Sequence, residues 1–299
     1  MESNATVIGR GTFGFVVLAG GHPKIAAKYI LKGQTAIFKK EQEAMEKLSH
    51  PNIVKFYGFG EDEYFNIIKM EYCERNSLLQ ILDDPSIIYS MVTAICWGEH
   101  MFAALKHLEK VGILHRDIKP ENVLVDHQFI LKLADFGCVR DSKSAKSFTS
   151  VGTLRYMSPE TAGALGISQS TLLSDVYAVG LILWEIIERR RVYSEYGLNP
   201  FSQQSLFRDI LDKKTVLSDP NCVQDGIKDF IRRSTSFYPN DRPRNDESLS
   251  FWSNLREKYG IETFLPIIDP QQKSLIRPIG FDGTLNRVAL EEDWISLSH

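Results

Sequence analysis

The sequence predicts an α+β fold in which strands come first and helices follow. Near the start, short apolar or β-branched segments at residues 6–8 and 17–19 flank a glycine-rich run, and an apolar strand returns at residues 25–30. Much later, a largely apolar stretch at residues 174–187 begins with Ser and Asp, which favour helix starts. Strands grouped ahead of helices are typical of α+β proteins.

The glycine-rich run at residues 9–16 predicts a phosphate-binding turn between two strands. Glycine lets backbone amides approach phosphate oxygens, and successive N–H groups form an anion-binding concavity. The same glycine spacing occurs in dinucleotide-binding folds, but there a helix follows the glycines. Here Gly20, Gly21 and Pro23 turn the chain back within a few residues, so we expect a β-hairpin instead.

The returning strand carries Lys28, which we expect to contact the α- and β-phosphates of a nucleotide. A lysine in an apolar strand needs a partner, and the helix predicted over residues 35–48 offers Glu41 and Glu43. Glu41 comes three residues after Phe38 and lies on the apolar face of this helix, whereas Glu43 projects sideways. We therefore predict an ion pair between Lys28 and Glu41.

Two polar runs predict the chemistry: HRDIKPEN, which begins at His115, and DFG, which begins at Asp135. Phosphoryl transfer has a loose transition state with charge spread over its oxygens, so a protein must mainly position the reactants and neutralise charge. Asp117 would accept the proton of a substrate hydroxyl, and Lys119 would reach the transferring phosphate. Asn122 and Asp135 would supply the hard oxygen ligands that magnesium prefers. A DFG tripeptide alone is explained equally well by a surface turn.

In combination these motifs resemble those of the eukaryotic protein kinases, over roughly residues 4–258. The resemblance implies a two-lobed fold: a small lobe built on an antiparallel sheet with one regulatory helix, and a larger, mainly helical lobe. ATP would lie in the cleft between the lobes with Mg²⁺, or alternatively Mn²⁺. The implied boundaries are residues 1–72 for the small lobe, residues 73–258 for the large lobe and residues 259–299 for a tail of unknown role.

The resemblance also assigns site residues. It gives catalytic roles to Asp117, Lys119, Lys28 and Glu41, and metal-binding roles to Asn122 and Asp135. The hinge backbone at Glu71 and Cys73 would bind adenine, and Ala26 and Leu124 would enclose its ring, although simple core packing explains these apolar residues equally well. The full set implied for ATP is Ile8, Gly9, Arg10, Gly11, Thr12, Phe13, Gly14, Phe15, Val16, Ala26, Lys28, Met70, Glu71, Cys73 and Leu124.

The substrate class is indicated by the residues that follow Asp117. Lys119 and the segment GTLRYMSPE at residues 152–160 resemble the serine/threonine type of protein kinase rather than the tyrosine type. Thr153 would hydrogen-bond near Asp117 and Lys119 and shape the site for a short hydroxyl side chain. The expected partners are a protein substrate with a Ser or Thr acceptor and an upstream kinase or adaptor.

The segment between Asp135 and Glu160, called the activation segment below, is dense in hydroxyl side chains. In the family, an arginine at the position of Arg116 pairs with a phosphorylated residue of this segment, since a phosphate adds nearly two charges and strong acceptors. We therefore expect activation by loop phosphorylation, with a solvated loop of no regulatory role as the alternative. The regulatory candidates are Ser147, Thr149, Ser150 and Thr153.

Further charged residues have structural roles by the same resemblance. Asp175 would hold the backbone of the catalytic loop, and Arg242 would pair with Glu160 to anchor the end of the activation segment. The basic run at residues 189–191 is either a docking site for an acidic substrate segment or, more simply, a solvated charged face.

The stretches at residues 51–58 and 174–190 are similar to those of the tyrosine-kinase-like group. Within that group the chain resembles the MAP kinase kinase kinases of the transforming-growth-factor-β-activated type, which implies a signalling role in a MAP kinase cascade. The competing interpretation is a pseudokinase that acts as a nucleotide-binding scaffold. Pseudokinases usually lose the counterparts of Lys28, Asp117 or Asp135, all of which are intact here.

Composition limits the remaining possibilities. With 299 residues and 43% hydrophobic content the chain can bury a large core, and a formal net charge of −3 gives no reason to expect nucleic-acid binding. The four cysteines show no metal-ligand spacing, and neither a signal peptide nor a membrane span is evident, so we expect a cytoplasmic protein without membrane insertion. Prolines argue against one long helix beyond Lys258. That tail would strap onto the large lobe, recruit a partner through Trp294, or be disordered.

Overall fold

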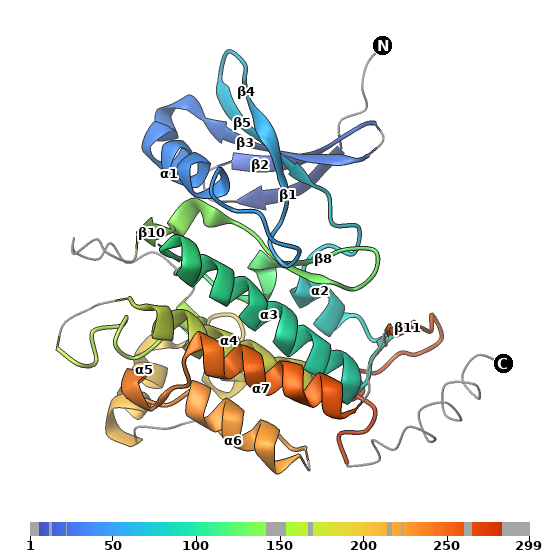
Figure 1. Cartoon of the computed structure of the whole chain (residues 1–299), viewed down its shortest axis with the longest axis vertical. Coiled ribbons are helices and arrows are strands. Elements are labelled where there is room, and N and C mark those ends of the chain that lie inside the picture. The colour runs from blue at the N-terminus through green and yellow to red at the C-terminus, as the bar shows by residue number, and fades with distance from the viewer. Residues whose placement is uncertain are drawn as a thin grey trace.

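The computed structural model has a strand-rich small lobe above a mainly helical large lobe (Figure 1). The two-lobed α+β fold predicted from the sequence is confirmed. The residues that the structure describes are 6–11, 14–21, 23–141, 154–166, 170–213, 217–222, 224–259 and 265–282. Within them, no helix is both long enough and apolar enough to cross a lipid bilayer.

The small lobe is built on an antiparallel sheet with the strand order β1-β2-β3-β5-β4. Its strands are β1 (Thr6–Gly11), β2 (Gly14–Ala19), β3 (Ile25–Leu31), β4 (Phe56–Glu61) and β5 (Phe65–Glu71). β1 and β2 form the hairpin predicted around the glycine-rich run, with Gly11 opposite Gly14. Gly14 is required there, since a Cβ would lie 1.7 Å from the carbonyl oxygen of Tyr29 on β3.

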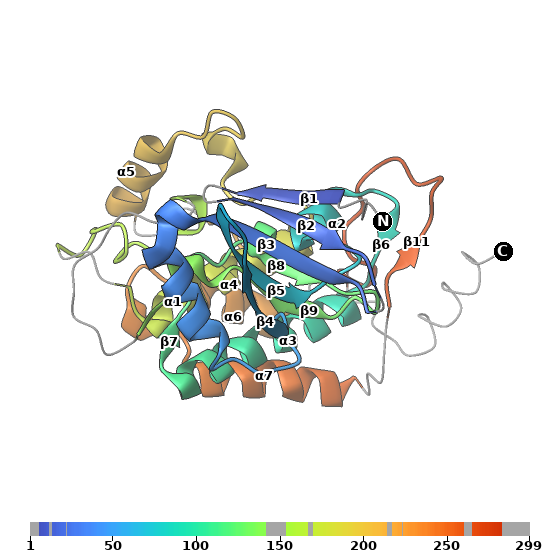
Figure 2. The ribbon, with the colours of Figure 1, turned by 90° about the horizontal axis from the view of Figure 1, so that it is seen from above.

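One helix, α1 (Thr35–Met45), belongs to the small lobe and lies along one side of the strands when they are seen from above (Figure 2). It ends three residues before the predicted limit of residue 48. The chain tightens into a turn at this point, where Lys47 N donates to Ala44 O at 3.0 Å. The buried face of α1 carries Glu41, whose side chain points toward the sheet.

The large lobe is organised around one central helix. Its helices are α2 (Leu78–Asp83), α3 (Met91–Val111), α4 (Leu172–Glu188), α5 (Gln203–Lys213), α6 (Asp225–Ser234) and α7 (Asn245–Lys258). Every residue of α4 from Ser174 to Glu188 is buried, as its apolar sequence predicted. α3 and α7 pack so closely that a Cβ on Gly98 would lie 2.5 Å from the Trp252 ring.

Short strands in the large lobe position the functional loops. They are β6 (Ile87–Ile88), β7 (Ile113–Leu114), β8 (Val123–Val125), β9 (Leu131–Leu133) and β10 (Arg140–Asp141). β8 pairs with β9 and β7 pairs with β10, both antiparallel. The HRDIKPEN run therefore lies between β7 and β8, and the DFG run follows β9.

The tail beyond α7 lies against the large lobe over residues 265–282. Its strand β11 (Ile267–Ile268) pairs with β6. Further along, Ile279 N donates to Tyr89 O at 2.9 Å and Ile279 O accepts from Met91 N at 2.8 Å. The strap alternative is therefore confirmed for this segment, which is called the strap below. Trp294 lies outside the described residues.

Candidate active site

Lys28 joins the two sides of the candidate site. Its Nζ lies 2.7 Å from Glu41 Oε1 and 2.8 Å from Asp135 Oδ1. Glu41 is 1% exposed, whereas Glu43 faces solvent, in keeping with the helical geometry argued from the sequence. Burial lowers the pKa of Lys28, but the two carboxylates outweigh burial and leave this pKa raised above its usual value. The amine therefore stays charged.

Asp135 has a left-handed backbone conformation, with φ 63°, at the start of a short turn that spans Phe136–Cys138. Phe136 is fully buried and packs edge-on against the His115 ring, with centroids 5.1 Å apart. Partial removal of the carboxylate from water raises the pKa of Asp135, but the charge and the hydrogen bond of Lys28 outweigh this effect, so the pKa lies below its usual range. The carboxylate is therefore ionised, which is the form that ligates a metal.

The loop between β7 and β8, which carries His115, Arg116 and Asp117, is called the catalytic loop below, and α4 holds its backbone. Asp175 on α4 accepts hydrogen bonds from His115 N and Arg116 N, both at 2.9 Å. Arg116 has φ 71°, a conformation that costs energy for a non-glycine residue. The paired bonds to Asp175 hold the strained backbone in place and confirm the role expected for this buried carboxylate.

Asp117 is 8% exposed and is held by two neighbours in its own loop. Lys119 Nζ lies 2.8 Å from Asp117 Oδ2. Asn122 Nδ2 donates to Asp117 O at 2.8 Å and to Asp117 Oδ2 at 3.0 Å. One carboxylate oxygen thus receives two donors, which fixes the orientation of the group.

A backbone hydrogen bond brings together the loops that carry Asn122 and Asp135, the two expected magnesium ligands. Asn122 O accepts from Ala134 N at 2.9 Å, which brings the two loops together next to Asp135. The amide nitrogen of Asn122 faces Asp117, so the amide oxygen is the end directed elsewhere. Within the described residues, no group of three or more His, Cys, Asp or Glu could hold a metal ion. An ion bound here would take its other ligands from phosphates and water, as magnesium commonly does.

The residues assigned to ATP lie in both lobes, but the Phe15 side chain stacks on Tyr29 and therefore lies on the sheet face opposite Lys28. Ile8, Gly9, Arg10, Gly11, Gly14, Phe15 and Val16 lie on β1 and β2, Ala26 and Lys28 on β3, Met70 and Glu71 on β5, Cys73 just beyond it, and Leu124 on β8. Val16 is paired with Lys28 in register, so the glycine-rich hairpin ends beside the lysine. This placement fits a nucleotide whose phosphates lie near Lys28. Thr12 and Phe13 lie outside the described residues.

Lys132 on β9 is a residue of this region that the sequence analysis missed. Its Nζ lies 3.1 Å from Glu71 Oε1 and 3.0 Å from the carbonyl oxygen of Pro51. Glu71 Oε2 in turn accepts from Lys55 N at 3.1 Å. The ion pair ties the hinge to the large lobe. The sequence does contain a signal for this ion pair. Lys132 lies between two leucines, and a lysine in such an apolar segment needs a partner, as Lys28 does.

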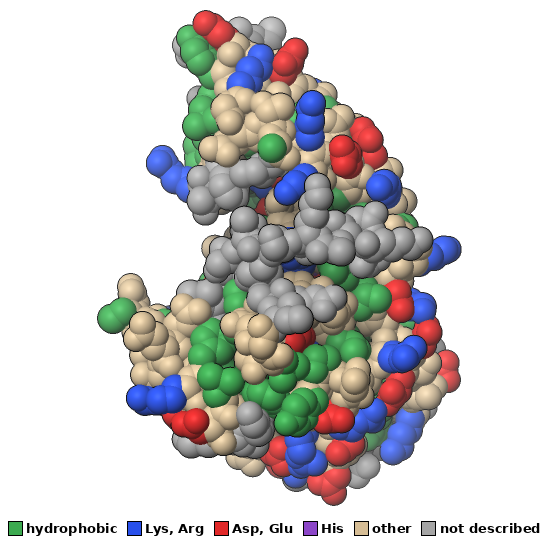
Figure 3. All heavy atoms as spheres, turned by 90° about the vertical axis from the view of Figure 1, so that its left-hand side faces the viewer, with side chains coloured by type: hydrophobic (Ala, Val, Ile, Leu, Met, Phe, Trp, Pro, Cys, Tyr) green, Lys and Arg blue, Asp and Glu red, His purple; other side chains and the backbone are tan. Residues whose placement is uncertain are grey.

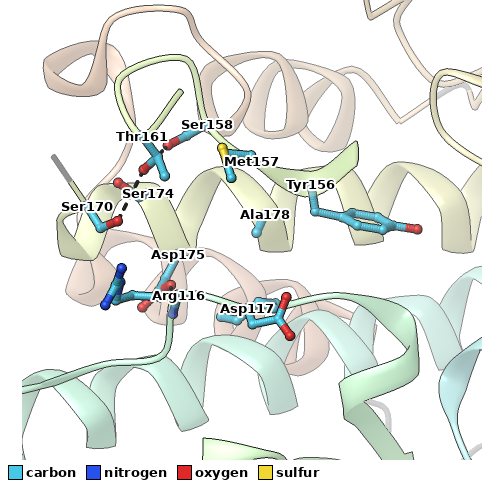
Figure 4. Close-up of a pocket in the computed structure, with 11 residues that line it drawn as sticks. Arg116, Asp117, Tyr156, Met157, Ser158, Thr161, Ser170, Ser174, Asp175 and Ala178 are labelled. Carbon is cyan, nitrogen blue, oxygen red and sulfur yellow. Dashed lines mark hydrogen bonds between the residues drawn. The ribbon is translucent and has the colours of Figure 1, made fainter. Parts of the chain in front are cut away.

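A small pocket lies between the catalytic loop and the end of the activation segment (Figure 4). Arg116, Asp117 and Ile118 line one side, and Tyr156, Met157 and Ser158 line the other. The second set of three residues forms the pocket wall opposite Asp117, and Ser174, Asp175 and Ala178 on α4 close the pocket between the two sides.

The far end of this wall is anchored as predicted. Arg242 Nη1 and Nη2 lie 2.7 and 2.8 Å from the two carboxylate oxygens of Glu160. Burial raises the pKa of Glu160, but the bonds from Arg242 outweigh burial and leave it below its usual value. The regulatory candidates Ser147, Thr149, Ser150 and Thr153 lie outside the described residues.

The basic run at residues 189–191 does not form the free cationic face considered from the sequence. Arg189 is 4% exposed and donates to Asp84 O at 2.7 Å. Arg191 donates to Tyr156 Oη at 3.3 Å and lies 3.7 Å from Glu185. Both interpretations were wrong for Arg189, because it follows a buried helix and its side chain folds back onto the lobe. Arg190 is exposed and lies over the Trp184 ring, as a solvated charged residue would.

Comparisons with known proteins agree with this geometry. Residues 3–251 match the protein kinase domain family. The serine/threonine-protein kinase SSK22 of Saccharomyces cerevisiae is 34% identical over 215 residues, 62% of this chain and 16% of that protein. A putative mitogen-activated protein kinase kinase kinase 7-like protein of Drosophila melanogaster is 30% identical over 267 residues, 86% of this chain and 65% of that protein.

A human relative carries a different class name. The cytoplasmic tyrosine-protein kinase BMX of Homo sapiens is 31% identical over 264 residues, 84% of this chain and 37% of that protein. The chain spans less than two thirds of the length of each of these three relatives.

Proposed function

We propose that this chain, which belongs to the protein kinase family, transfers the γ-phosphoryl group of ATP to serine and threonine hydroxyls of proteins. One observation carries the proposal: Lys119 and Asn122 both donate to Asp117, so the carboxylate that would receive the hydroxyl proton has a fixed orientation. Magnesium bound by Asn122 and Asp135 would neutralise charge on the phosphates.

In the transfer step, the acceptor hydroxyl oxygen bonds to the γ-phosphorus while the bond from that phosphorus to the bridging oxygen breaks and ADP leaves. The hydroxyl proton passes to the Asp117 carboxylate. Lys119, 2.8 Å from Asp117, would offset negative charge beside the transferring group. Lys28, held between Glu41 and Asp135, would bind the α- and β-phosphates.

Serine and threonine are the proposed acceptors because of the HRDIKPEN run and the contact between Lys119 and Asp117. We also propose a cytoplasmic signalling kinase of the MAP kinase kinase kinase type, a class supported by the name of the Drosophila relative. Phosphorylation at Ser147, Thr149 or Ser150 would activate it. The proposed division is a small lobe at residues 1–72, a large lobe at residues 73–258 and a tail at residues 259–299.

The acceptor class is tested by incubating the protein with magnesium, ATP and casein, followed by phosphoamino acid analysis of both proteins. Phosphoserine or phosphothreonine is the expected product. Phosphotyrosine would contradict the proposed acceptor class. ATP binding without transfer, in protein whose activation segment is phosphorylated, would instead indicate a nucleotide-binding scaffold.

A further inference from the structure

We propose that Arg155 is a positioning residue for the protein substrate: it ties the end of the activation segment to the loop between α4 and α5 and thereby fixes the wall opposite Asp117. The inference rests on the proposed function, since it concerns the acceptor side of the same site. Arg155 itself does not line the pocket, whereas the three residues that follow it do.

Arg155 reaches three carbonyl groups of one loop. Its Nη1 donates to Val192 O at 2.6 Å and to Tyr193 O at 3.1 Å, and its Nη2 donates to Gly197 O at 2.9 Å. The guanidinium also lies over the Phe201 ring, 4.0 Å from the centroid. The residue is 9% exposed, so these contacts are largely shielded from water.

The use of arginine at this buried position needs a reason. Burial lowers the pKa of Arg155, which reflects the cost of removing a charge from water. The loop it serves has an irregular backbone, with left-handed residues at Tyr193 (φ 55°) and Gly197 (φ 91°). Tyr193 O also accepts from Tyr196 N at 3.1 Å, whereas Val192 O and Gly197 O accept from Arg155. The planar guanidinium fork can serve both of these carbonyls at once. An aliphatic side chain would fill the space but leave those carbonyls unsatisfied.

The next residue, Tyr156, is linked to the same loop through Glu185. Tyr156 Oη donates to Glu185 Oε1 at 2.9 Å, and Val192 N donates to that same oxygen at 2.7 Å. The carbonyl of Val192 therefore accepts a hydrogen bond from Arg155. The N–H of Val192 and the hydroxyl of Tyr156 donate to the same oxygen of Glu185. Two consecutive residues of the activation segment are thus fixed to one point of the α4–α5 loop.

This double attachment determines where the pocket wall lies. Tyr156, Met157 and Ser158 lie across the pocket from Asp117 (Figure 4). An acceptor peptide would approach Asp117 along this end of the activation segment. Small displacements of reactants reduce transfer strongly. Loss of Arg155 should therefore weaken productive binding of the protein substrate. The nucleotide residues around Lys28 lie on other elements and should be unaffected.

The neighbouring surface is consistent with a role in substrate contact. The face that carries α5 shows apolar side chains gathered on the large lobe (Figure 3). Leu198, in the loop that Arg155 holds, is 64% exposed, and Leu211 on α5 is 42% exposed. The loop anchored by Arg155 thus carries apolar surface in addition to its contacts with the pocket wall.

Arg189 provides a matched control. It is also buried, donates to the backbone carbonyls of Asp84, Leu82 and Ile81, and lies over the Tyr89 ring at 4.7 Å. It differs in location, because it serves the end of α2 and the strap rather than the pocket wall. Replacing either arginine should therefore cost stability, but only one replacement should alter substrate binding.

The experiment compares Arg155→Met and Arg155→Lys with Arg189→Met and Arg189→Lys in the full chain. For each variant it measures Tm, KM and kcat with casein, and Kd for ATP. Arg155→Met should raise KM for casein about tenfold with Kd for ATP within about twofold of the wild type, and Arg155→Lys should fall between. Both Arg189 variants should lower Tm and leave KM for casein unchanged. If a Met variant does not fold, the two Lys variants decide.

Equal shifts in KM for casein at Arg155 and Arg189 would overturn the inference, because both residues would then act only through stability. An unchanged KM in Arg155→Met would overturn it as well. A wild-type protein that transfers no phosphate would contradict the proposed function and this inference together. An active wild type with equal KM shifts contradicts the inference alone.

Discussion

Lys28 Nζ lies 2.8 Å from Asp135 Oδ1, which ties a strand of the small lobe to the loop that follows β9 in the large lobe. The same amine contacts Glu41 on α1. Three elements that are distant in sequence therefore converge on one cation. The contact aligns α1 with the candidate metal ligand and places the lysine where phosphates would bind.

Replacing Glu41 by Gln should lower the rate of phosphoryl transfer about 10- to 100-fold. Gln has nearly the same size but removes the charge that faces Lys28 at 2.7 Å. The amine would then be oriented only by Asp135, which it needs to share with a metal and with phosphates. Initial rates with casein at saturating ATP measure the effect.

Glu43→Gln is the matched control, because Glu43 lies two residues further along the same helix and faces solvent. Its rate should stay within about twofold of the wild type, as surface charges contribute little. Equal losses in the two variants would contradict a specific role for the ion pair with Lys28.

Local patterns in the sequence predicted those parts of the site that depend only on residues close together in the chain. Helical spacing selected Glu41 over Glu43, and the glycine turn at Gly20 and Gly21 selected a hairpin over a dinucleotide-binding helix. These choices depend on the direction of side chains and on turns within a few residues. The predicted helix at residues 35–48 was too long, because turn bonds at its end are not visible in apolar spacing.

Other features depend on contacts between distant segments and could not be predicted in this way. Arg155 stands next to residues of a known motif, but its acceptors lie about forty positions later in an irregular loop. Nothing in the sequence separates Arg189 from the two arginines that follow it, because its burial depends on the burial of α4. Burial of a charged side chain is set by tertiary packing, which composition and periodicity do not report.

Glu185 should make stability depend on pH. It is 1% exposed, and burial raises its pKa to about 7. The folded protein therefore holds a proton on Glu185 that the unfolded chain, with a pKa of about 4.3, releases. The stability linked to this proton is fully present below about pH 4 and is lost as pH rises through about 7, by at most about 4 kcal/mol.

Glu185→Gln removes this titration while keeping an acceptor oxygen for Tyr156 and Val192. The Tm of the variant minus that of the wild type should increase from pH 5 to pH 8. Thermal unfolding at four pH values across that range measures the difference. A difference that stays constant would show that Glu185 titrates normally in the folded protein.

Removal of the strap should destabilise the large lobe without affecting the chemistry. Besides the pairing of β11 with β6, three backbone bonds join the strap to the lobe: Asp269 N to Ser86 O, Ile279 N to Tyr89 O and Met91 N to Ile279 O. At about 1 kcal/mol each, these three alone lead us to expect that truncation after Lys258 lowers the free energy of unfolding by at least about 3 kcal/mol. Urea unfolding measures this change, and kcat below the unfolding transition should be unchanged.

A single substitution separates the strap contacts from other effects of truncation. Ile279→Pro removes the N–H that donates to Tyr89 O and should cost about 1 kcal/mol. A truncated protein with wild-type stability would show that the strap contributes no net free energy. Loss of kcat in Ile279→Pro at a temperature where it is folded would show that the strap also acts on the active site.

The most direct test of the account measures phosphate transfer from ATP to casein by the wild type and by Asp117→Asn, with ATP affinity measured in parallel. Asn preserves the shape held by Lys119 and Asn122 but cannot accept the hydroxyl proton. In Asp117→Asn, transfer should fall by about 1,000-fold or more while Kd for ATP stays within about threefold of the wild type. Transfer by Asp117→Asn at the wild-type rate would contradict the assignment of this site.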